Sequence, residues 1–236
     1  MVSRFAVALC LSVSWHQPVA LGADPDPRDL VREVRRLQAG KSYKISGVLS
    51  KGRKKVSFSM SVLGDIDTVR FRFRDPVQNI SLVQKADRYR LTEQLAREEP
   101  KDLAQDRYGE KIRGMDITYE DLSQRYLYWP GAHLLGDEKI RVVVRHDAWV
   151  VQLDNPRRGF GPYQSVKIWV DKESGALLRI LAHDWDGRPV KRFVVTKVHR
   201  DKEWGVLLER MRVETIDPKG NVREMSYMTL GKPERD

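Results

Sequence analysis

The feature that most constrains the fold is a series of short segments, between residues 132 and 230, in which apolar and polar residues alternate. A period of two places one side of a strand against a core and the other side against solvent. Turn residues such as Asn155-Pro156, Ser174-Gly175 and Asp186-Gly187 separate the segments, and connections this short join antiparallel neighbours. The pattern predicts strands at residues 132–135, 140–146, 148–153, 163–170, 177–183, 190–199, 206–216 and 222–230.

One amphipathic helix is predicted near the N-terminus. Asp26 is suited to the N-cap position, Pro27 to the first helical position, and Gly40 follows the expected end. Its apolar face is formed by Leu30, Val34 and Leu37.

Further alternating segments follow this helix, and they predict strands at residues 42–50, 55–63, 68–74, 79–83 and 88–91. Together with the C-terminal series, they predict a mainly β (α+β) protein of about eleven or twelve strands and two or three helices. So many short-connected strands favour a strongly curved antiparallel sheet, an incomplete barrel with helices over its mouth.

Residues 114–130 carry a different, local signal. Their sequence is Gly-Met-Asp-Ile-Thr-Tyr-Glu-Asp-Leu-Ser-Gln-Arg-Tyr-Leu-Tyr-Trp-Pro. Thr118 followed three residues later by Asp121 resembles a capping box, so a short helix is expected to start at Tyr119. Pro130 then stops any helix.

This stretch and the residues after it resemble the LolA-like outer-membrane lipoprotein-sorting protein family. The resemblance rests on the box at 114–122, on Val-Lys-Ile-Trp-Val-Asp-Lys-Glu-Ser-Gly at 166–175, and on Asp-Trp-Asp-Gly-Arg-Pro-Val-Lys at 184–191. The family's box has Phe where this chain has Ile117, and its Tyr-Asp turn is replaced by Trp185-Asp186. The resemblance covers residues 114–232. It implies one half-barrel domain over residues 23–236, with the N-terminal helix and lid helices over the open face, and it makes residues 92–113 the lid candidate.

The first 22 residues are predicted to be a cleavable signal peptide. Arg4 supplies the charged start, residues 5–15 are apolar, and small residues precede a cleavage site near Gly22. Cys10, the only cysteine, falls inside this segment and follows Leu9, which is unfavourable for lipidation. We therefore expect a soluble periplasmic protein that is not a lipoprotein; the alternative is a buried N-terminal helix.

The net charge of +10 is concentrated in one region, because residues 41–74 hold nine Lys or Arg and two Asp. Three interpretations are open: a solvated strand face, an anionic membrane or lipid headgroup, and nucleic acid, against which export argues. Arginines alternate with apolar residues over 69–74, as on a half-buried strand. The candidates for a membrane-facing or headgroup-binding surface are Lys54, Lys55, Arg70 and Arg72.

The sequence gives little indication of catalysis. His133, His146, His183 and His199 lack metal-ligand spacing, so neither a metal nor another cofactor is expected. Asp116, Glu120 and Asp121 could form an acid/base pair, but capping already accounts for Asp121. We expect no enzyme.

A curved sheet must fill its concave face with its own side chains, a helix or an apolar ligand. The inward-facing candidates are Phe58, Met60, Phe71, Phe73, Tyr126, Trp129, Trp149, Val151, Ile168, Val170, Ile180 and Met211. With the family resemblance, they predict a periplasmic carrier that holds the acyl chains of a lipoprotein or lipid and exchanges them with inner- and outer-membrane transfer proteins. The alternatives are an envelope-stress-type sensor or interaction module on the same fold, and a structural domain whose own helices fill the pocket.

Overall fold

The structure, a computed structural model, describes residues 24–38, 42–63, 68–85, 88–201 and 205–235 of the 236-residue chain. The predicted signal peptide (1–22) and Gly40 lie outside the described residues. The side chain of Leu37 is also outside the description.

Thirteen strands of the described chain form one antiparallel sheet in the order β6-β5-β4-β3-β2-β1-β13-β12-β11-β10-β9-β8-β7. Among the described residues the end strands β6 and β7 do not pair with each other, so the sheet is open. The strands are β1 (Tyr43–Lys51), β2 (Lys54–Leu63), β3 (Thr68–Phe73), β4 (Gln78–Lys85), β5 (Arg88–Leu95), β6 (Lys101–Asp102), β7 (Gly131–Val142), β8 (Val144–Asp154), β9 (Ser165–Asp171), β10 (Leu177–His183), β11 (Pro189–Asp201), β12 (Gly205–Ile216) and β13 (Val222–Glu234).

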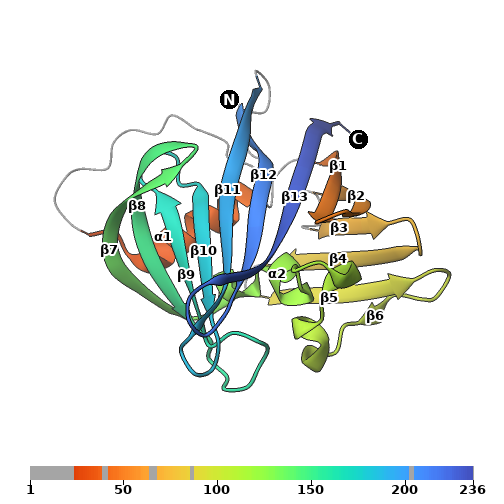
Figure 1. Ribbon diagram of the computed structural model, residues 1–236, viewed down its shortest axis with the longest axis horizontal. Coiled ribbons are helices and arrows are strands. Elements are labelled where there is room, and N and C mark those ends of the chain that lie inside the picture. The colour runs from red at the N-terminus through yellow and green to blue at the C-terminus, as the bar shows by residue number, and fades with distance from the viewer. Residues whose placement is uncertain (1–23, 39–41, 64–67, 86–87, 202–204, 236) are drawn as a thin grey trace.

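The sheet bends so that its two ends enclose a common core. Strands β3–β5 run across the view of Figure 1 and strands β7–β13 run steeply through it. The halves join where β1 pairs with β13, and a bulge between Ile45 and Gly47 interrupts that pairing. The expected incomplete barrel is confirmed, with thirteen strands instead of about eleven.

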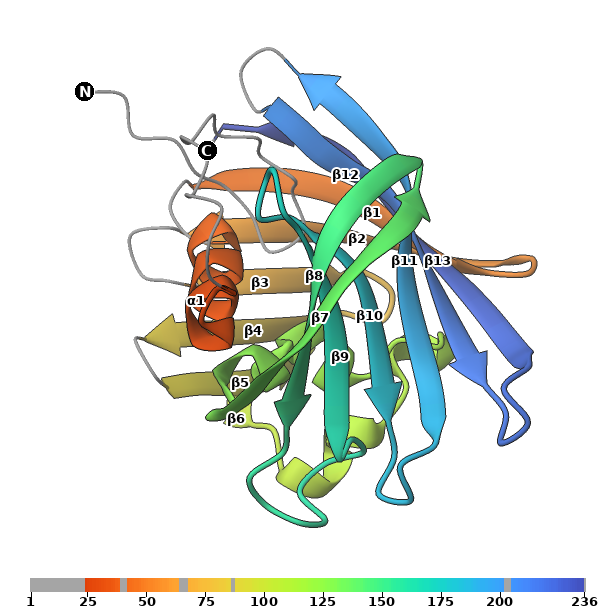
Figure 2. The same cartoon turned by 90° about the vertical axis from the view of Figure 1, so that its left-hand side faces the viewer.

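Helix α1 (Pro27–Gln38) lies across the open side of the curved sheet (Figure 2). The Asp26 carboxylate accepts a hydrogen bond of 2.8 Å from the Arg28 backbone N–H, as expected of the predicted N-cap. Val31 and Val34 are buried in the core, and Leu30 packs beside them. Val31, which was not among the predicted apolar residues, therefore belongs to the buried face of the helix, and Leu30 lies at its edge.

The alternation in β2 and β3 separates the two faces of the sheet. Phe58, Met60, Phe71 and Phe73 are buried on the inner face, the face that encloses the core. The Phe58 ring lies 6.0 Å from Phe71 and 5.9 Å from Phe73, so these side chains form one aromatic cluster.

Residues 131–154 differ from the prediction of three short strands. They form one long hairpin of β7 and β8, in which Val142 pairs with Val144 around a single turn residue, Val143. A turn centred on valine carries no sequence signal, so the alternation alone does not locate it.

The lid candidate, residues 92–113, also has a mixed structure. It begins as the end of β5, adds β6, and continues as two 3₁₀ turns, η1 (Gln105–Gly109) and η2 (Ile112–Gly114). The β5 alternation is hidden in the sequence because its buried position after Leu91 is Glu93, a charged residue. Leu103, Tyr108 and Ile112 are buried, so the segment packs on the domain.

Gly47 offers a test of this packing. A Cβ at position 47 lies only 2.3 Å from Phe58 Cζ, so Gly47→Ala forces the aromatic cluster to move. We expect a loss of about 1–3 kcal/mol in unfolding free energy, measured by urea denaturation. Ser46→Ala, on the exposed face of the same strand, is the control. If Gly47→Ala and Ser46→Ala unfold at the same urea concentration, the close approach of the Phe58 ring to Gly47 is contradicted.

Candidate functional site

The box segment, which we define as residues 114–130, covers part of the concave interior. It contains helix α2 (Tyr119–Ser123) and the 3₁₀ turn η3 (Arg125–Tyr128). The Thr118 N–H donates to Asp121 Oδ2 at 2.7 Å, and the Asp121 N–H donates to Thr118 Oγ1 at 3.3 Å. The predicted capping box and the helix start at Tyr119 are confirmed.

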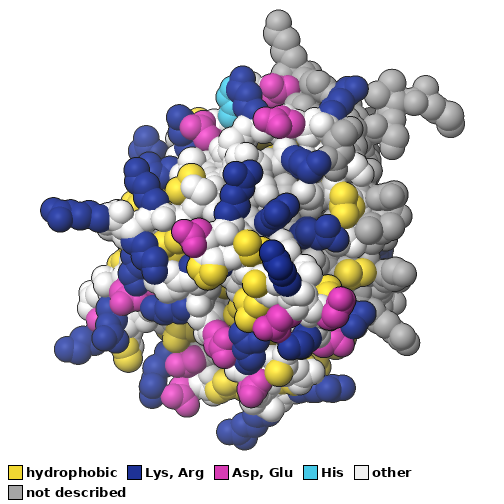
Figure 3. Space-filling model, turned by 90° about the vertical axis from the view of Figure 1, so that its right-hand side faces the viewer, with side chains coloured by type: hydrophobic (Ala, Val, Ile, Leu, Met, Phe, Trp, Pro, Cys, Tyr) yellow, Lys and Arg dark blue, Asp and Glu magenta, His cyan; other side chains and the backbone are white. Residues whose placement is uncertain are grey.

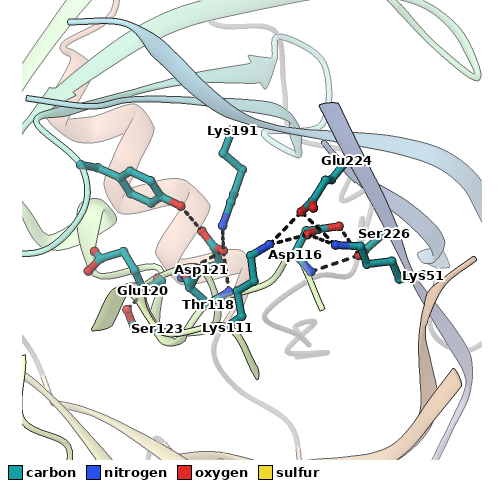
Figure 4. Close-up of polar contacts among 11 residues, drawn as sticks. Lys51, Lys111, Asp116, Thr118, Glu120, Asp121, Ser123, Lys191, Glu224 and Ser226 are labelled. Carbon is teal, nitrogen blue, oxygen red and sulfur yellow. Dashed lines mark hydrogen bonds and ion pairs between the residues drawn. The ribbon is translucent and has the colours of Figure 1, made fainter. Parts of the chain in front are cut away.

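Asp121 also fixes the box segment to the sheet (Figure 4). The buried Lys191 ammonium, from β11, donates to Asp121 Oδ2 at 2.6 Å. The Tyr163 hydroxyl donates to Asp121 Oδ1 at 2.6 Å. One carboxylate therefore caps α2 and holds it against both β11 and the loop before β9.

Asp116 makes a second fixed contact, on the β1 and β13 side. The Ser226 hydroxyl of β13 and the Lys51 ammonium of β1 each donate to the fully buried Asp116 carboxylate at 2.7 Å. Lys111 donates to the same carboxylate at 3.1 Å and to Glu224 at 2.8 Å (Figure 4). The hydrogen bond to Asp116 raises the pKa of Lys51, so this group stays charged.

Tyr119 connects the box segment to the other half of the sheet. Its hydroxyl donates to the buried Glu93 carboxylate of β5 and accepts from the Gln78 side chain of β4 at 2.9 Å. Arg107, from η1, donates to the other Glu93 oxygen at 2.8 Å. The segment is thus held by polar contacts to β1, β4, β5, β11 and β13.

Glu120 and Arg125 form a fully buried ion pair within the box segment. Arg125 Nε donates to Glu120 Oε1 at 2.7 Å, and the side chains are 1% and 0% exposed. The guanidinium carbon lies 4.6 Å from the centre of the Tyr108 ring and 4.3 Å from that of Phe160. Burial raises the pKa of Glu120 to about 7, although Arg125 acts in the opposite direction.

Among the described residues, a small cavity lies in the apolar interior beneath the box segment. Its volume is about 20 Å³, enough for about one water molecule. Its lining comes from both halves of the sheet and from the box segment: Val69, Phe71, Leu82, Ile117, Asp121, Leu122, Gln124, Tyr126, Ile180, Phe193, Met211 and Met228.

The sequence-predicted interior residues fall into three groups. Phe71, Tyr126, Ile180 and Met211 line the cavity. Phe58, Met60, Phe73, Trp129, Val151, Ile168 and Val170 are buried elsewhere in the core. Trp149 is only half-buried, and the Lys172 ammonium lies 3.8 Å from its ring centre, so it stands at the margin of the core.

Tyr126 and Trp129 belong to the cover of the interior and not to its wall, because both lie in or beside η3. The wall residues Leu82, Phe193 and Met228 were missed, although each lies in a predicted strand. The alternation of these strands was visible in the sequence. Which inward-facing residues of different strands line the same cavity depends on the curvature of the sheet, which the alternation does not give.

The predicted headgroup residues lie away from this interior. Arg70 and Arg72 are exposed on the outer face of β3, and Lys54 and Lys55 are exposed at the start of β2. Figure 3 shows the side of the molecule that carries β1–β6, where Lys and Arg side chains are spread over the surface. Since the sheet separates Arg70 and Arg72 from the cavity, they face an external partner or solvent.

Comparisons with known proteins place this fold. A protein-family model described as "Uncharacterized protein" matches residues 84–231, more than half of the chain. A comparison with curated proteins finds no match.

Three solved structures are similar in fold. A DUF1329 family protein from Desulfovibrio piger has 16% identity and a TM-score of 0.69, with 90% of this chain and 94% of that chain covered. An outer membrane lipoprotein-sorting protein domain from Vibrio parahaemolyticus has 14% identity, a TM-score of 0.71 and coverage of 88% and 91%. A LolA superfamily protein from Nitrosomonas europaea has 14% identity, a TM-score of 0.65 and coverage of 90% and 94%. The expected LolA-like fold is therefore confirmed.

Two further observations concern the described part of the chain. No helix there has the length and apolar character needed to cross a membrane. No group of three or more His, Cys, Asp or Glu side chains is arranged there to hold a metal ion.

Gly161 tests the buried Arg125 environment. Gly161 has φ +83°, and a Cβ there lies 2.0 Å from Arg125 Nη2, whereas Gly159 has φ +74° and nothing within 4 Å. Both alanine variants carry similar backbone strain, but only Gly161→Ala displaces the buried guanidinium. We expect Gly161→Ala to lower the midpoint of thermal unfolding by roughly 5 °C more than Gly159→Ala. Equal midpoints contradict the packing of Arg125 described above.

Glu120 predicts a pH dependence of stability. Its pKa is raised from 4.5 to about 7, so between these values the folded protein holds a proton that the unfolded chain has released. Stability due to this group is full below the lower value and falls as pH rises, by up to about 1.4 kcal/mol per pH unit. We expect Glu120→Gln to flatten this decline in urea titrations at several pH values. Glu99→Gln, at an exposed position, is the control, and an unchanged decline in Glu120→Gln refutes the assignment.

Proposed function

Because the chain belongs to the family described as "Uncharacterized protein" and has the LolA-like fold, we propose that it carries the acyl chains of a lipoprotein or lipid across the periplasm. The acyl chains occupy the concave interior, and the box segment with α1 forms the cover. The protein has no catalytic role, and its partners are membrane transfer proteins and an anionic membrane surface.

The observation that carries the proposal is the continuous apolar wall contributed by both halves of an open sheet. Phe71 of β3, Ile180 of β10 and Met211 of β12 face one cavity although they lie far apart in the sequence. Because β6 and β7 are not hydrogen-bonded to each other in the described chain, the interior can widen without breaking the sheet.

Loading requires the cover to move. A cavity of about 20 Å³ cannot accept an acyl chain, since pockets for small ligands have roughly 300–1,000 Å³. The cover is held both by apolar packing, for example of Ile117, Leu122 and Tyr126, and by polar contacts. Two of the cations in these polar contacts, Lys51 and Lys111, are 28% and 47% exposed. As the cover opens, water can therefore replace the hydrogen-bond partners that these groups lose. Each CH₂ of the incoming acyl chain that becomes buried contributes about 0.8 kcal/mol to the free energy of binding.

The basic outer face supports contact with an anionic membrane surface. Arg70 and Arg72 are exposed and have no ion-pair partner among the described residues. In this proposal the outer face approaches lipid headgroups while the interior holds the acyl chains.

The first experiment is native mass spectrometry of the mature protein purified from a periplasmic extract, followed by lipid analysis. We expect a co-purifying acylated species, and we expect the purified protein to take up an uncharged fluorescent acyl ester. A mass that matches the polypeptide alone, together with no uptake of the ester, contradicts the carrier function.

Ser226 links uptake to the cover. Ser226→Ala removes both hydrogen bonds between Ser226 and Asp116 but leaves the Lys51 pair, which weakens the cover by about 1–2 kcal/mol. Opening then becomes roughly 5–30 times more frequent, and uptake of the acyl ester should accelerate by a similar factor. Ser61→Ala, on the outer side of β2, is the control. Unchanged uptake in Ser226→Ala means that the cover does not control entry.

A second candidate is an interaction module on the same fold, and the small volume of the cavity between the described residues favours it. Such a module binds a partner through its outer surface and takes up no acyl ester. The uptake experiment therefore separates the two candidates.

A further inference from the structure

The end of the hairpin formed by β7 and β8 combines three locally unfavourable features. We define residues 141–145 as the hairpin tip. Val142 pairs with Val144, and Val143 forms the turn between them with φ +60°. A β-branched residue is an outlier in this left-handed region, because its side chain crowds the backbone. Glycine or asparagine at position 143 would avoid this strain. The geometry of the turn therefore does not account for a valine at this position.

The second feature is the exposure of apolar side chains. Val143 is 49% exposed and Val144 is 60% exposed, side by side at the same tip. Scattered exposed apolar residues are ordinary, but adjacent ones at the end of a hairpin form a small apolar point. Figure 2 shows the β7–β8 hairpin extending beyond its neighbours β9 and β10.

The third feature is a pair of like charges. Arg141 lies directly opposite Arg145 in the strand register, and like charges in such pairs repel. Neither has a carboxylate partner among the described residues, whereas nearby acids are already engaged: Asp137 with Lys172, Glu138 with Trp169, and Asp147 with Lys139. Both guanidinium groups are thus available to an external anion.

A shallow hollow connects these features. It has a volume of about 530 Å³, and its lining comes entirely from the hairpin: Lys139, Ile140, Arg141, Val143, Val144 and Arg145. Cations surround apolar side chains there, which is the arrangement of segments that lie in the interface of an anionic bilayer. An acidic protein surface would neutralise the arginines but would leave the exposed valines without an apolar partner.

We propose that the hairpin tip is a membrane-docking element for bilayers that contain anionic lipids. The two valines enter the interfacial region, and Arg141 and Arg145 bind lipid phosphates. The inference rests on the proposed function only in placing the protein at a membrane, since acyl uptake in solution does not involve the tip.

Val143→Gly gives the most discriminating test, because a structural role and a docking role predict different results. Glycine accepts the positive φ, so the variant is expected to unfold at a higher temperature than the wild type. It also loses an apolar side chain at the tip, so its binding to phosphatidylglycerol-containing vesicles should fall about threefold in a flotation assay. The double variant Val143→Ser/Val144→Ser should lose at least about tenfold.

The charges are tested separately in the same assay. Arg141→Gln/Arg145→Gln should lower binding to the anionic vesicles about tenfold, and it should weaken the salt dependence of binding. Arg97→Gln/Arg223→Gln removes two exposed arginines elsewhere and is expected to have a smaller effect. The variant with glutamine at Lys54, Lys55, Arg70 and Arg72 tests the outer face, and unchanged binding there removes that face from the membrane contact.

The proposal is overturned if the full chain does not float with any of the vesicles. It is also overturned if the hairpin-tip variants bind the vesicles as strongly as the wild type does. Uptake of the acyl ester without vesicles is measured for every variant. Normal uptake with lost vesicle binding supports the docking role, whereas normal vesicle binding without uptake rejects the carrier function alone.

Discussion

The arrangement depends on two buried carboxylates, Asp116 and Asp121, and on the cations that neutralise them. A charge removed from water is unfavourable unless it is paired and hydrogen-bonded, so each carboxylate requires its partners on the sheet. Lys191 meets Asp121, and Lys51 with Ser226 meets Asp116, at distances of 2.6–2.7 Å. These contacts fix the position of the box segment over the concave face, because an apolar surface alone would allow it to slide.

This way of holding the cover has a functional consequence. The stabilisation from apolar packing decreases steadily as apolar surface is exposed to water. Polar groups at the margin of the cover can instead exchange their protein partners for water. In the proposed carrier function, the cover is therefore specific in its closed position and still opens. The open edge between β6 and β7 allows the wall to adapt, which is what a carrier of flexible acyl chains requires.

Local signals made much of this predictable from the sequence. The Thr118 and Asp121 capping box and the alternation of β2 and β3 involve residues a few positions apart, and both were confirmed. The partners of the carboxylates could not be predicted, because Lys191 lies seventy positions from Asp121 and resembles any surface lysine in the sequence. Glu93 and Val143 contradict local preferences, so they hid the end of strand β5 and the turn between β7 and β8. The small volume of the cavity between the described residues follows from side-chain packing across the sheet, which alternation does not determine.

The measurement that tests the central claim most directly is amide hydrogen exchange of the purified protein, with and without a bound acyl ester. The account predicts that the ester reduces protection in residues 115–129, where the cover is displaced, while the walls in β3, β10 and β12 stay equally or better protected. Unchanged protection of residues 115–129 in the presence of a stoichiometrically bound ester would contradict the account, because the ligand would then have entered without moving the cover.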